Sequence, residues 1–394
     1  MVSAVLFITF FVLLVLNVPI SICLGLSSAA AILYSGTSLT IVATNIYSGI
    51  SKFLLLAIPF FVLSGNIMAK AGISTRLIRF VDTCVGHRKG GIANVCIIVA
   101  CFFGAISGSG PATVAALGAV LIPAMVERGG FSAPFSTALM ATASSIAIVI
   151  PPSIAFVVYA SITGVSIGDM FMAGIVPGIL MGLALIVVVM LEVRKNHVVP
   201  SNVQKASAKE RLDAFKDAFW GFLMPVIILG GIYGGIFTPT EAAAVSVVYG
   251  LFVGMVIYKE VKLKDLWDIL IDSAKTTGGI MLIVACASLF SFVCTRFGIS
   301  AAASQLLAKV AGNQFTFLLI CNVIFLIAGC FIDANSAMYI FIPIMLPVCK
   351  QLGYNVIAFG IMATVNLAIG QVTPPVGVNP VSYTHLRAHE TEAD

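Results

Sequence analysis

The sequence has little charge, few histidines and no paired cysteine motif. Only 9% of its 394 residues are Asp, Glu, Lys or Arg, whereas 60% are hydrophobic. A soluble domain carries about 25% charged residues, so this composition cannot cover a water-facing surface. The four histidines and nine cysteines lack Cys-x-x-Cys pairs and metal-ligand spacing, which argues against a zinc site. Most of the chain is therefore predicted to lie in a lipid bilayer, and no nucleic-acid partner is expected.

Long apolar runs predict membrane helices. Lipid cannot satisfy backbone amides, so a spanning segment must be a helix or part of a closed barrel. The runs are much longer than the roughly 10-residue alternating strands of a barrel. The first run, residues 1–17, lacks a basic start and a small-residue cleavage site, so we interpret it as a helix and not as a signal peptide. Apolar segments recur at about 3–16, 18–36, 53–69, 90–126, 130–160, 170–191, 218–237, 240–258, 276–294, 314–349 and 355–382.

Two of these apolar segments are interrupted in the middle. Residues 90–126 contain no charge, but Ser107–Thr113 is rich in glycine and hydroxyls and includes a proline, a poor helical sequence. Flanks of about 17 and 13 residues would measure about 25 and 20 Å, less than the roughly 30 Å hydrocarbon core. Residues 314–349 are broken in the same way at Gly329–Ser336. We therefore predict two re-entrant helical hairpins.

Each predicted hairpin is followed by a helix with a double proline. The pairs are Pro151-Pro152, within 130–160, and Pro374-Pro375, within 355–382. Amphipathic pieces at 71–85 and 296–311 also match, since both contain Gly-Ile-Ser. The expected fold is thus an all-α polytopic membrane protein with two repeats, 1–191 and 218–382, joined by a cytoplasmic linker at 192–217.

The distribution of basic residues predicts the orientation. One side of the membrane receives Lys70, Arg76, Arg79, Arg88, Lys89, Arg128, Arg194, Lys195, Lys205, Lys209, Arg211, Lys216, Lys259, Lys262, Lys264 and Lys275. With that side in the cytoplasm, the N-terminus lies outside and the two hairpins open to opposite sides. The repeats then have inverted topology, which is typical of secondary transporters whose site lies between broken helices.

The four breaks predict two cation sites. A helix broken within the membrane exposes carbonyls and amides that lipid cannot satisfy, and carbonyls with hydroxyls suit Na⁺. The first predicted Na⁺ site comprises Ser107, Ser109, Ala147, Ile150 and Pro151. The second comprises Gly329, Asp333, Gly370, Thr373 and Val376. Asp333 has an alternative role as a helix cap at the hairpin tip.

A substrate is expected between the two hairpin tips. Half-helix N-termini there suit an anion. The predicted substrate residues are Ser109, Pro111, Thr113, Ser153, Asn335, Pro374 and Asn379. An intramembrane enzyme is the remote alternative, but it would need a nucleophile with a base, and the sequence offers no histidine at membrane depth. No organic cofactor is expected, because the glycines of 104–110 are not followed by the Gly-Lys-Ser/Thr of a phosphate loop.

Five motifs resemble the large membrane subunit of tripartite ATP-independent periplasmic (TRAP) transporters. They are Leu56–Phe61, Ile106–Gly118, Ile150–Ile154, Ile236–Ala244 and Thr373–Asn379. The similarity extends from about residue 1 to 382. It implies an elevator-type, Na⁺-coupled importer in the bacterial inner membrane. The implied partners are a small four-helix membrane subunit and a periplasmic binding protein that delivers an organic acid.

Two features depart from that family. Ala147 stands where the family more often has glycine, which affects the backbone geometry expected at the first break. Residues 383–394 form a polar tail where the family has a further apolar helix, so we expect a C-terminal truncation with a non-native end. A stand-alone Na⁺/organic-anion symporter of related fold, which needs no binding protein, is the alternative function.

Overall fold

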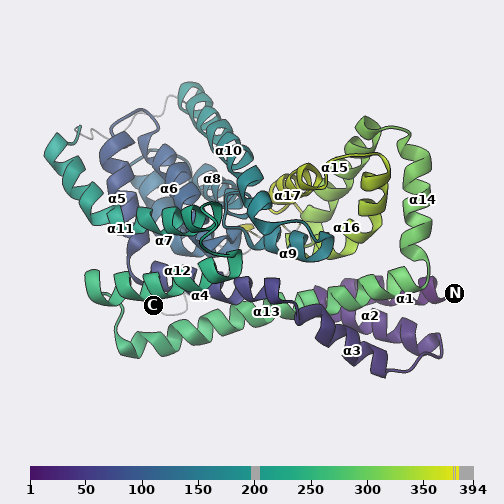
Figure 1. Cartoon of the computed structure of the whole chain (residues 1–394). Helices are drawn as coiled ribbons and strands as arrows, with labels where there is room; N and C mark the ends of the chain where they lie inside the picture. Colours follow the sequence, from purple (N-terminus) through teal and green to yellow (C-terminus); the bar gives the residue numbers. More distant parts are fainter. Residues whose placement is uncertain (197–204, 376, 378, 381–394) are drawn as a thin grey trace.

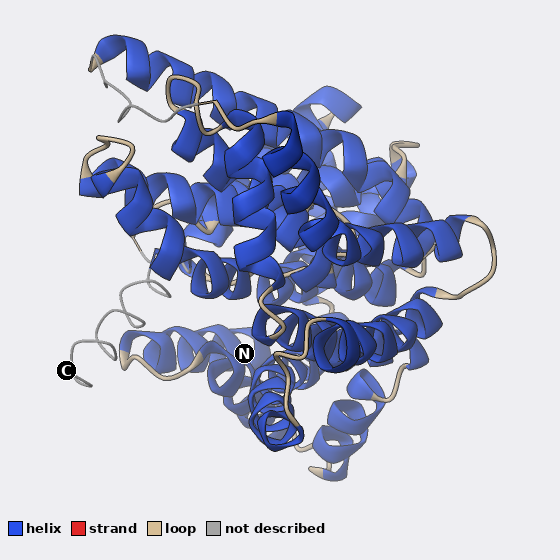
Figure 2. Cartoon of the chain, turned by 90° about the vertical axis from the view of Figure 1, so that its left-hand side faces the viewer, coloured by secondary structure: helices blue, strands red, loops and turns tan. Residues whose placement is uncertain are grey.

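A computed structural model describes residues 1–196, 205–375, 377 and 379–380. The described residues form seventeen α-helices, with short 3₁₀ or π segments and no β-strand (Figures 1 and 2). Seven helical stretches are long and apolar enough to cross a membrane: 53–70 (η1 and α4), α7 (Gly110–Glu127), α10 (Ile167–Lys195), α11 (Ala208–Tyr233), 239–257 (α12 and η3), α13 (Leu263–Arg296) and α15 (Gln314–Phe331). The chain is therefore an all-helical, polytopic membrane protein.

Ten further helices complete the described part of the chain. They are α1 (Val2–Val15), α2 (Ile20–Tyr34), α3 (Thr40–Ile50), α5 (Ile73–Val85), α6 (Gly91–Ser107), α8 (Ala133–Ser145), α9 (Ile154–Thr163), α14 (Ile299–Ala311), α16 (Ala334–Gln351) and α17 (Val356–Gly370). Most of them are too short to cross the roughly 30 Å hydrocarbon core alone. Helices α6, α9 and α17 are largely buried, whereas α1 and α3 are largely exposed.

The longest helix, α13, crosses the lower part of Figure 1, with α2 and α3 below its right-hand half. It packs against α2, α3, α4 and α16, while α4 (Ala57–Lys70) packs against α12 (Pro239–Phe252). The apolar segment predicted at 276–294 is only part of this helix, because the preceding residues from Leu263 continue it to give 34 residues in all, about 51 Å. Gly278 and Gly279 lower helix propensity but do not break the helix.

The first predicted hairpin is a helix–turn–helix made of α6 and α7. Only Gly108, in the left-handed conformation, and the extended residue Ser109 separate the two helices. The broad interruption predicted over Ser107–Thr113 is wrong, because Pro111 lies in the first turn of α7, where proline is tolerated. Helix α7 therefore has 18 residues, about 27 Å, and its length alone does not exclude a crossing.

The second predicted hairpin consists of α15 and α16. The helices are separated only by Ile332 and Asp333, both extended, so the break is again narrower than the predicted Gly329–Ser336. Asp333 is the N-cap of α16: its carboxylate accepts hydrogen bonds from the backbone N–H groups of Asn335 and Ser336. A capped helix can begin immediately after the turn, which explains the narrow break.

Both proline pairs interrupt their helices. Helix α8 ends at Ser145, continues as a 3₁₀ turn over Ile146–Ile148, and is followed by a non-helical stretch up to α9. Helix α17 ends at Gly370, just before the second pair. Proline removes a backbone donor and clashes with the preceding turn, so neither pair can continue a helix. Val376 and the expected non-native tail at 383–394 lie outside the described residues.

The polar stretch 192–217 is helical at both ends. Helix α10 extends to Lys195, and α11 begins at Ala208, where Ser207 and Glu210 form a capping box. Basic residues near the end of α10 and a strong cap at the start of α11 stabilise these ends. The predicted linker is thus shorter than its polar composition indicated, and its residues 197–204 lie outside the described part.

The centre of the structure is formed around α9. Its residues 154–161 are all buried, and the Tyr159 hydroxyl donates a 2.6 Å hydrogen bond to the carbonyl of Val356 at the start of α17. Gly360 faces the Tyr159 ring so closely that a methyl group there would overlap it. Helix α9 also packs against α16. The half-helix after the first proline pair therefore joins elements from the two halves of the sequence.

Candidate ion and substrate sites

At the first break, the tip of the α6–α7 turn lies directly on the proline segment. A Cβ atom built on Gly108 would be 2.6 Å from the carbonyl oxygen of Pro152, and the Ile154 N–H donates to the Gly108 carbonyl at 3.5 Å. One turn earlier, a Cβ on Gly104 would be 2.8 Å from Cα of Ala147. The predicted first site therefore has its two segments in contact.

Hydroxyl groups line this turn. Ser107 Oγ and Thr113 Oγ1 lie 3.0 Å apart, and Thr113 Oγ1 donates to the Ser109 carbonyl at 2.8 Å. Ser107 and Thr113 are buried. Each hydroxyl oxygen has two lone pairs, so these groups retain acceptor capacity for a cation. Ser153 caps α9 and donates a 2.6 Å hydrogen bond to the Ile148 carbonyl, which fixes the break from the other side.

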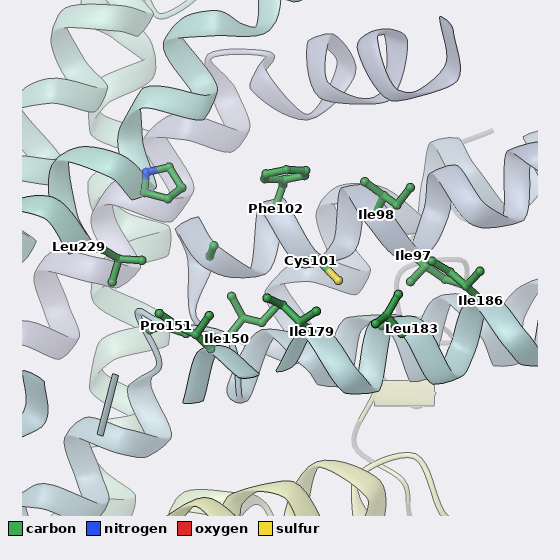
Figure 3. Close-up of a pocket in the computed structure, with 14 residues that line it drawn as sticks. Ile97, Ile98, Cys101, Phe102, Ile150, Pro151, Ile179, Leu183, Ile186 and Leu229 are labelled. Carbon is green, nitrogen blue, oxygen red and sulfur yellow. The ribbon is translucent and has the colours of Figure 1, made fainter. Parts of the chain in front are cut away.

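Ile150 and Pro151 offer an ion only their main-chain oxygens. Their side chains line an apolar pocket between α6, α10 and α11 (Figure 3). Ala147 is fully buried, and the glycine at 104 leaves room for its methyl group, because a Cβ at Gly104 would be 2.9 Å from that of Ala147. The alanine is therefore accommodated here by its glycine neighbour.

The second break repeats this close approach. A Cβ on Gly329 would lie 2.9 Å from Cα of Gly370, so the ends of α15 and α17 touch through their backbones. Thr373 Oγ1 donates to the Ile369 carbonyl at 2.8 Å. The Asp333 carboxylate caps α16 and also accepts a short hydrogen bond from the Ser336 hydroxyl. This geometry favours the capping role among the two roles predicted for Asp333.

Asn379 joins the second break to the first hairpin. Its side chain is fully buried, and Nδ2 donates to the Ala141 carbonyl of α8 at 3.2 Å. Its Oδ1 faces Gly110, where a Cβ would lie 2.9 Å away, and has no hydrogen-bond partner among the described residues. The segment after the second proline pair thus reaches the N-terminus of α7, which carries Pro111 and Thr113.

Two predicted substrate residues, Asn335 and Pro374, are not joined to the first hairpin by any described contact. The amide oxygen of Asn335 is buried and has no partner among the described residues, but no described contact joins it to the first hairpin tip. Pro374 is exposed. The structure therefore brings Ser109, Pro111, Thr113, Ser153 and Asn379 to one region, whereas Asn335 and Pro374 lie beside the second break.

Sequence reasoning missed three polar or glycine positions. Gly104 makes the close contact at the first break, and its place one turn before the hairpin turn matches that of Gly329. Gln371, next to Gly370, is buried with an unpartnered Oε1, and its carbonyl accepts the Asn379 N–H at 3.3 Å. Asn366 Nδ2 donates to Asn322 Oδ1 at 2.6 Å. Gln371 and Asn366 could have been found from the sequence, because each is an amide side chain within a long apolar segment.

The donors gathered at both breaks are neutral oxygens. In the described ranges, no group of three His, Cys, Asp or Glu residues could hold a metal ion. Buried carbonyls, hydroxyls and unpartnered amide oxygens suit a hard, singly charged cation better than a transition metal. Buried polar groups without partners also mark places where water, an ion or a polar ligand completes the structure.

Broken helices with buried, unmatched oxygens in a multi-pass helical fold define a membrane transport protein. The chain matches the family described as "Tripartite ATP-independent periplasmic transporter, DctM component" over residues 7–384, and it belongs to that family. It is thus the large permease component of a TRAP transporter in the inner membrane, and not an enzyme. Membership in a tripartite family implies two further components, a periplasmic binding protein and a small membrane subunit.

Individual relatives are similar over most of the chain. The "C4-dicarboxylate TRAP transporter large permease protein DctM" of Pseudomonas aeruginosa is 42% identical over 90% of this chain and 83% of the relative. The protein of the same description from Rhodobacter capsulatus is 39% identical, over 93% and 86%. The "Isethionate TRAP transporter permease protein DctMQ" of Oleidesulfovibrio alaskensis is 42% identical over 95% of this chain and 59% of that relative.

Proposed function

We propose that this permease imports a small organic acid by Na⁺-coupled, elevator-type alternating access. The observation that carries the proposal is the matched pair of backbone contacts, Gly104–Ala147 and Gly329–Gly370, each beside a proline break. Such contacts bring the carbonyl ends of two helices together, where their partial negative charge favours a cation. One Na⁺ per break follows, with Ser107 among the donors at the first and Thr373 at the second.

The substrate lies near the N-terminus of α7 in this proposal. Backbone N–H groups at a helix N-terminus attract an anion, and Asn379 adds an amide beside Gly110. The named substrates of relatives are acids: C4-dicarboxylates, isethionate and, for a protein of Escherichia coli, 2,3-diketo-L-gulonate. These names support an anionic organic substrate and leave its identity to the pocket and to the binding protein.

Alternating access requires two units that move against each other. We assign 1–191 and 218–382 as inverted repeats, with the N-terminus outside, the α6–α7 hairpin open to the cytoplasm and the α15–α16 hairpin open to the outside. In this assignment α2 of the first repeat corresponds to α12 of the second, and α4 corresponds to the C-terminal part of α13. The packing of α2 on α13 then corresponds to the packing of α12 on α4, and the presence of both contacts supports the assignment. The partners are a small four-helix membrane subunit and a periplasmic binding protein, which a stand-alone symporter would not need.

Reconstituted uptake tests this function. Proteoliposomes would contain this chain with the small subunit, with a substrate-loaded binding protein outside and equal pH on both sides. Uptake is expected with an inward Na⁺ gradient and not with K⁺ in its place. Equal uptake with K⁺ would refute the Na⁺ coupling. Equal uptake when the binding protein is replaced by free substrate would favour the stand-alone alternative.

A further inference from the structure

An apolar pocket lies beside the first proline pair and is lined by Ile150 and Pro151. Its volume is about 390 Å³, and the fourteen residues that line it are all apolar or glycine (Figure 3). They come from α6, α10, α11 and the segment that contains Ile150 and Pro151. Such walls offer water no hydrogen-bond partner, so the pocket favours a hydrocarbon occupant.

The pocket opens onto the lipid-facing surface of α10. Ile179 and Leu183 line it and are both 52% exposed, and Phe102 of α6 is 38% exposed. Their neighbours on α10, Leu180 and Val187, are also exposed. The pocket is continuous with this exposed apolar surface, which is of the kind that acyl chains cover in a bilayer.

A cluster of basic residues lies beyond one end of the pocket, where α6 begins and α10 ends. The turn before α6 packs on the end of α10, since a Cβ on Gly90 would lie 2.9 Å from the Val193 side chain. This contact brings the Arg88-Lys89 turn beside Arg194 and Lys195. All four side chains are exposed, and none forms an ion pair within the described residues. Basic clusters between membrane helices bind anionic lipid headgroups.

The dimensions fit a single lipid. Ile186 lines the pocket, and Arg194 follows it on the same helix by eight residues, about 12 Å. One leaflet contributes about half of the roughly 30 Å hydrocarbon core, or about 15 Å. A lipid whose phosphate rests on the basic cluster can therefore place the end of an acyl chain in the pocket.

We propose that this pocket and the Arg88, Lys89, Arg194 and Lys195 cluster together bind one anionic phospholipid. The acyl chain enters between α6 and α10 and packs toward Pro151, while the phosphate is held by the four cations. The site is distinct from the polar turn that faces Ala147 and Asn379, and it does not depend on whether Na⁺ drives transport.

Quenching of a single tryptophan by brominated lipid tests the site. In a Trp220→Phe, Trp267→Phe background, Leu183→Trp reports the pocket and Leu180→Trp reports the adjacent lipid-facing surface. Dibrominated phosphatidylglycerol, titrated into phosphatidylcholine vesicles, should half-quench position 183 at a mole fraction about fivefold lower than position 180. Dibrominated phosphatidylcholine should quench the two positions alike. Identical curves with phosphatidylglycerol would overturn the proposal.

Two further experiments test whether the basic cluster is required for lipid binding. Replacing the four basic residues by Gln should abolish the difference, whereas Lys262→Gln with Lys264→Gln, an exposed basic pair on another helix, should preserve it. Raising the salt concentration in the unmodified reporter proteins should weaken the preference by screening, which tests the same point without the fourfold variant. A preference that survives both changes would refute the headgroup contact.

Discussion

The backbones of Gly329 and Gly370 touch directly: a Cβ atom built on Gly370 would lie 2.6 Å from Cα of Gly329. Each glycine lies at or next to the end of a helix, one turn from a break. The first half of the chain has Gly104 against Ala147, where one methyl group is tolerated because its neighbour has none. These contacts hold the ends of two helices together. The carbonyl groups at those ends would otherwise face hydrocarbon.

Substituting Gly370 by alanine should damage both folding and transport. The clash is with backbone, so no side-chain rotation relieves it, and overpacking of this kind costs about 1–3 kcal/mol. We expect a lower melting temperature in detergent and loss of uptake. Gly278→Ala is the matched control, because no atom lies within 4 Å of a Cβ there. Unchanged melting and uptake in Gly370→Ala would mean that the close approach is unimportant.

Asn379→Leu should weaken substrate use. The change removes the donor to the Ala141 carbonyl and the free Oδ1 near Gly110, and an unmatched buried carbonyl costs about 1–3 kcal/mol. We expect a KM for uptake raised about tenfold or more. Asn196→Ala, at the exposed end of α10, serves as control. A KM equal to that of the unmodified chain would remove Asn379 from the substrate site.

Ser107→Ala should affect the Na⁺ requirement. Thr113 keeps its bond to the Ser109 carbonyl, so the turn should stay folded. Loss of one oxygen donor worth about 1 kcal/mol should raise the Na⁺ concentration for half-maximal uptake about fivefold. Thr142→Ala removes a hydroxyl that bonds only within its own helix and should have no such effect. Similar Na⁺ curves for Ser107→Ala and Thr142→Ala would argue against the first site.

Lys52 should make stability depend on pH. Its Nζ donates a 2.8 Å hydrogen bond to the Ser161 carbonyl, near the end of α9, and burial lowers its pKa. Between the lowered folded pKa and the unfolded value of about 10.4, the unfolded chain binds more protons, so the free energy of unfolding rises with pH. In Lys52→Met this rise should be smaller. Parallel melting-temperature curves for the two proteins up to about pH 10.4 would contradict the assignment.

The proline pairs and hairpin turns could be predicted from the sequence because their causes are local. Proline cannot continue a helix wherever it lies in the fold, so the interruptions at Pro151 and Pro374 follow from chemistry alone. The extent of the breaks could not be predicted as well. Whether Pro111 ends a helix or begins one depends on the turn at Gly108 and Ser109 that precedes it, and the start of α16 depends on the cap at Asp333.

The individual contacts between distant segments could not be predicted from the sequence. Nothing near Asn379 indicates that it reaches Ala141, more than two hundred residues earlier. The role of Gly104 also depends on a neighbour, Ala147, that only the folded chain supplies. The sequence predicted that residues of both halves would meet near the hairpin tips, whereas the individual contacts, such as that of Asn379 with Ala141, required the structure.

Equilibrium binding of radioactive Na⁺ to the purified chain tests most directly whether the breaks capture sodium. We expect saturable binding that K⁺ does not displace, reduced at a concentration near the Kd by about a third in Ser107→Ala and in Thr373→Ala, and by about two thirds in the double variant, if each substitution weakens its own site about fivefold. Equal binding by the unmodified chain and the double variant, or no saturable binding at all, would contradict the account.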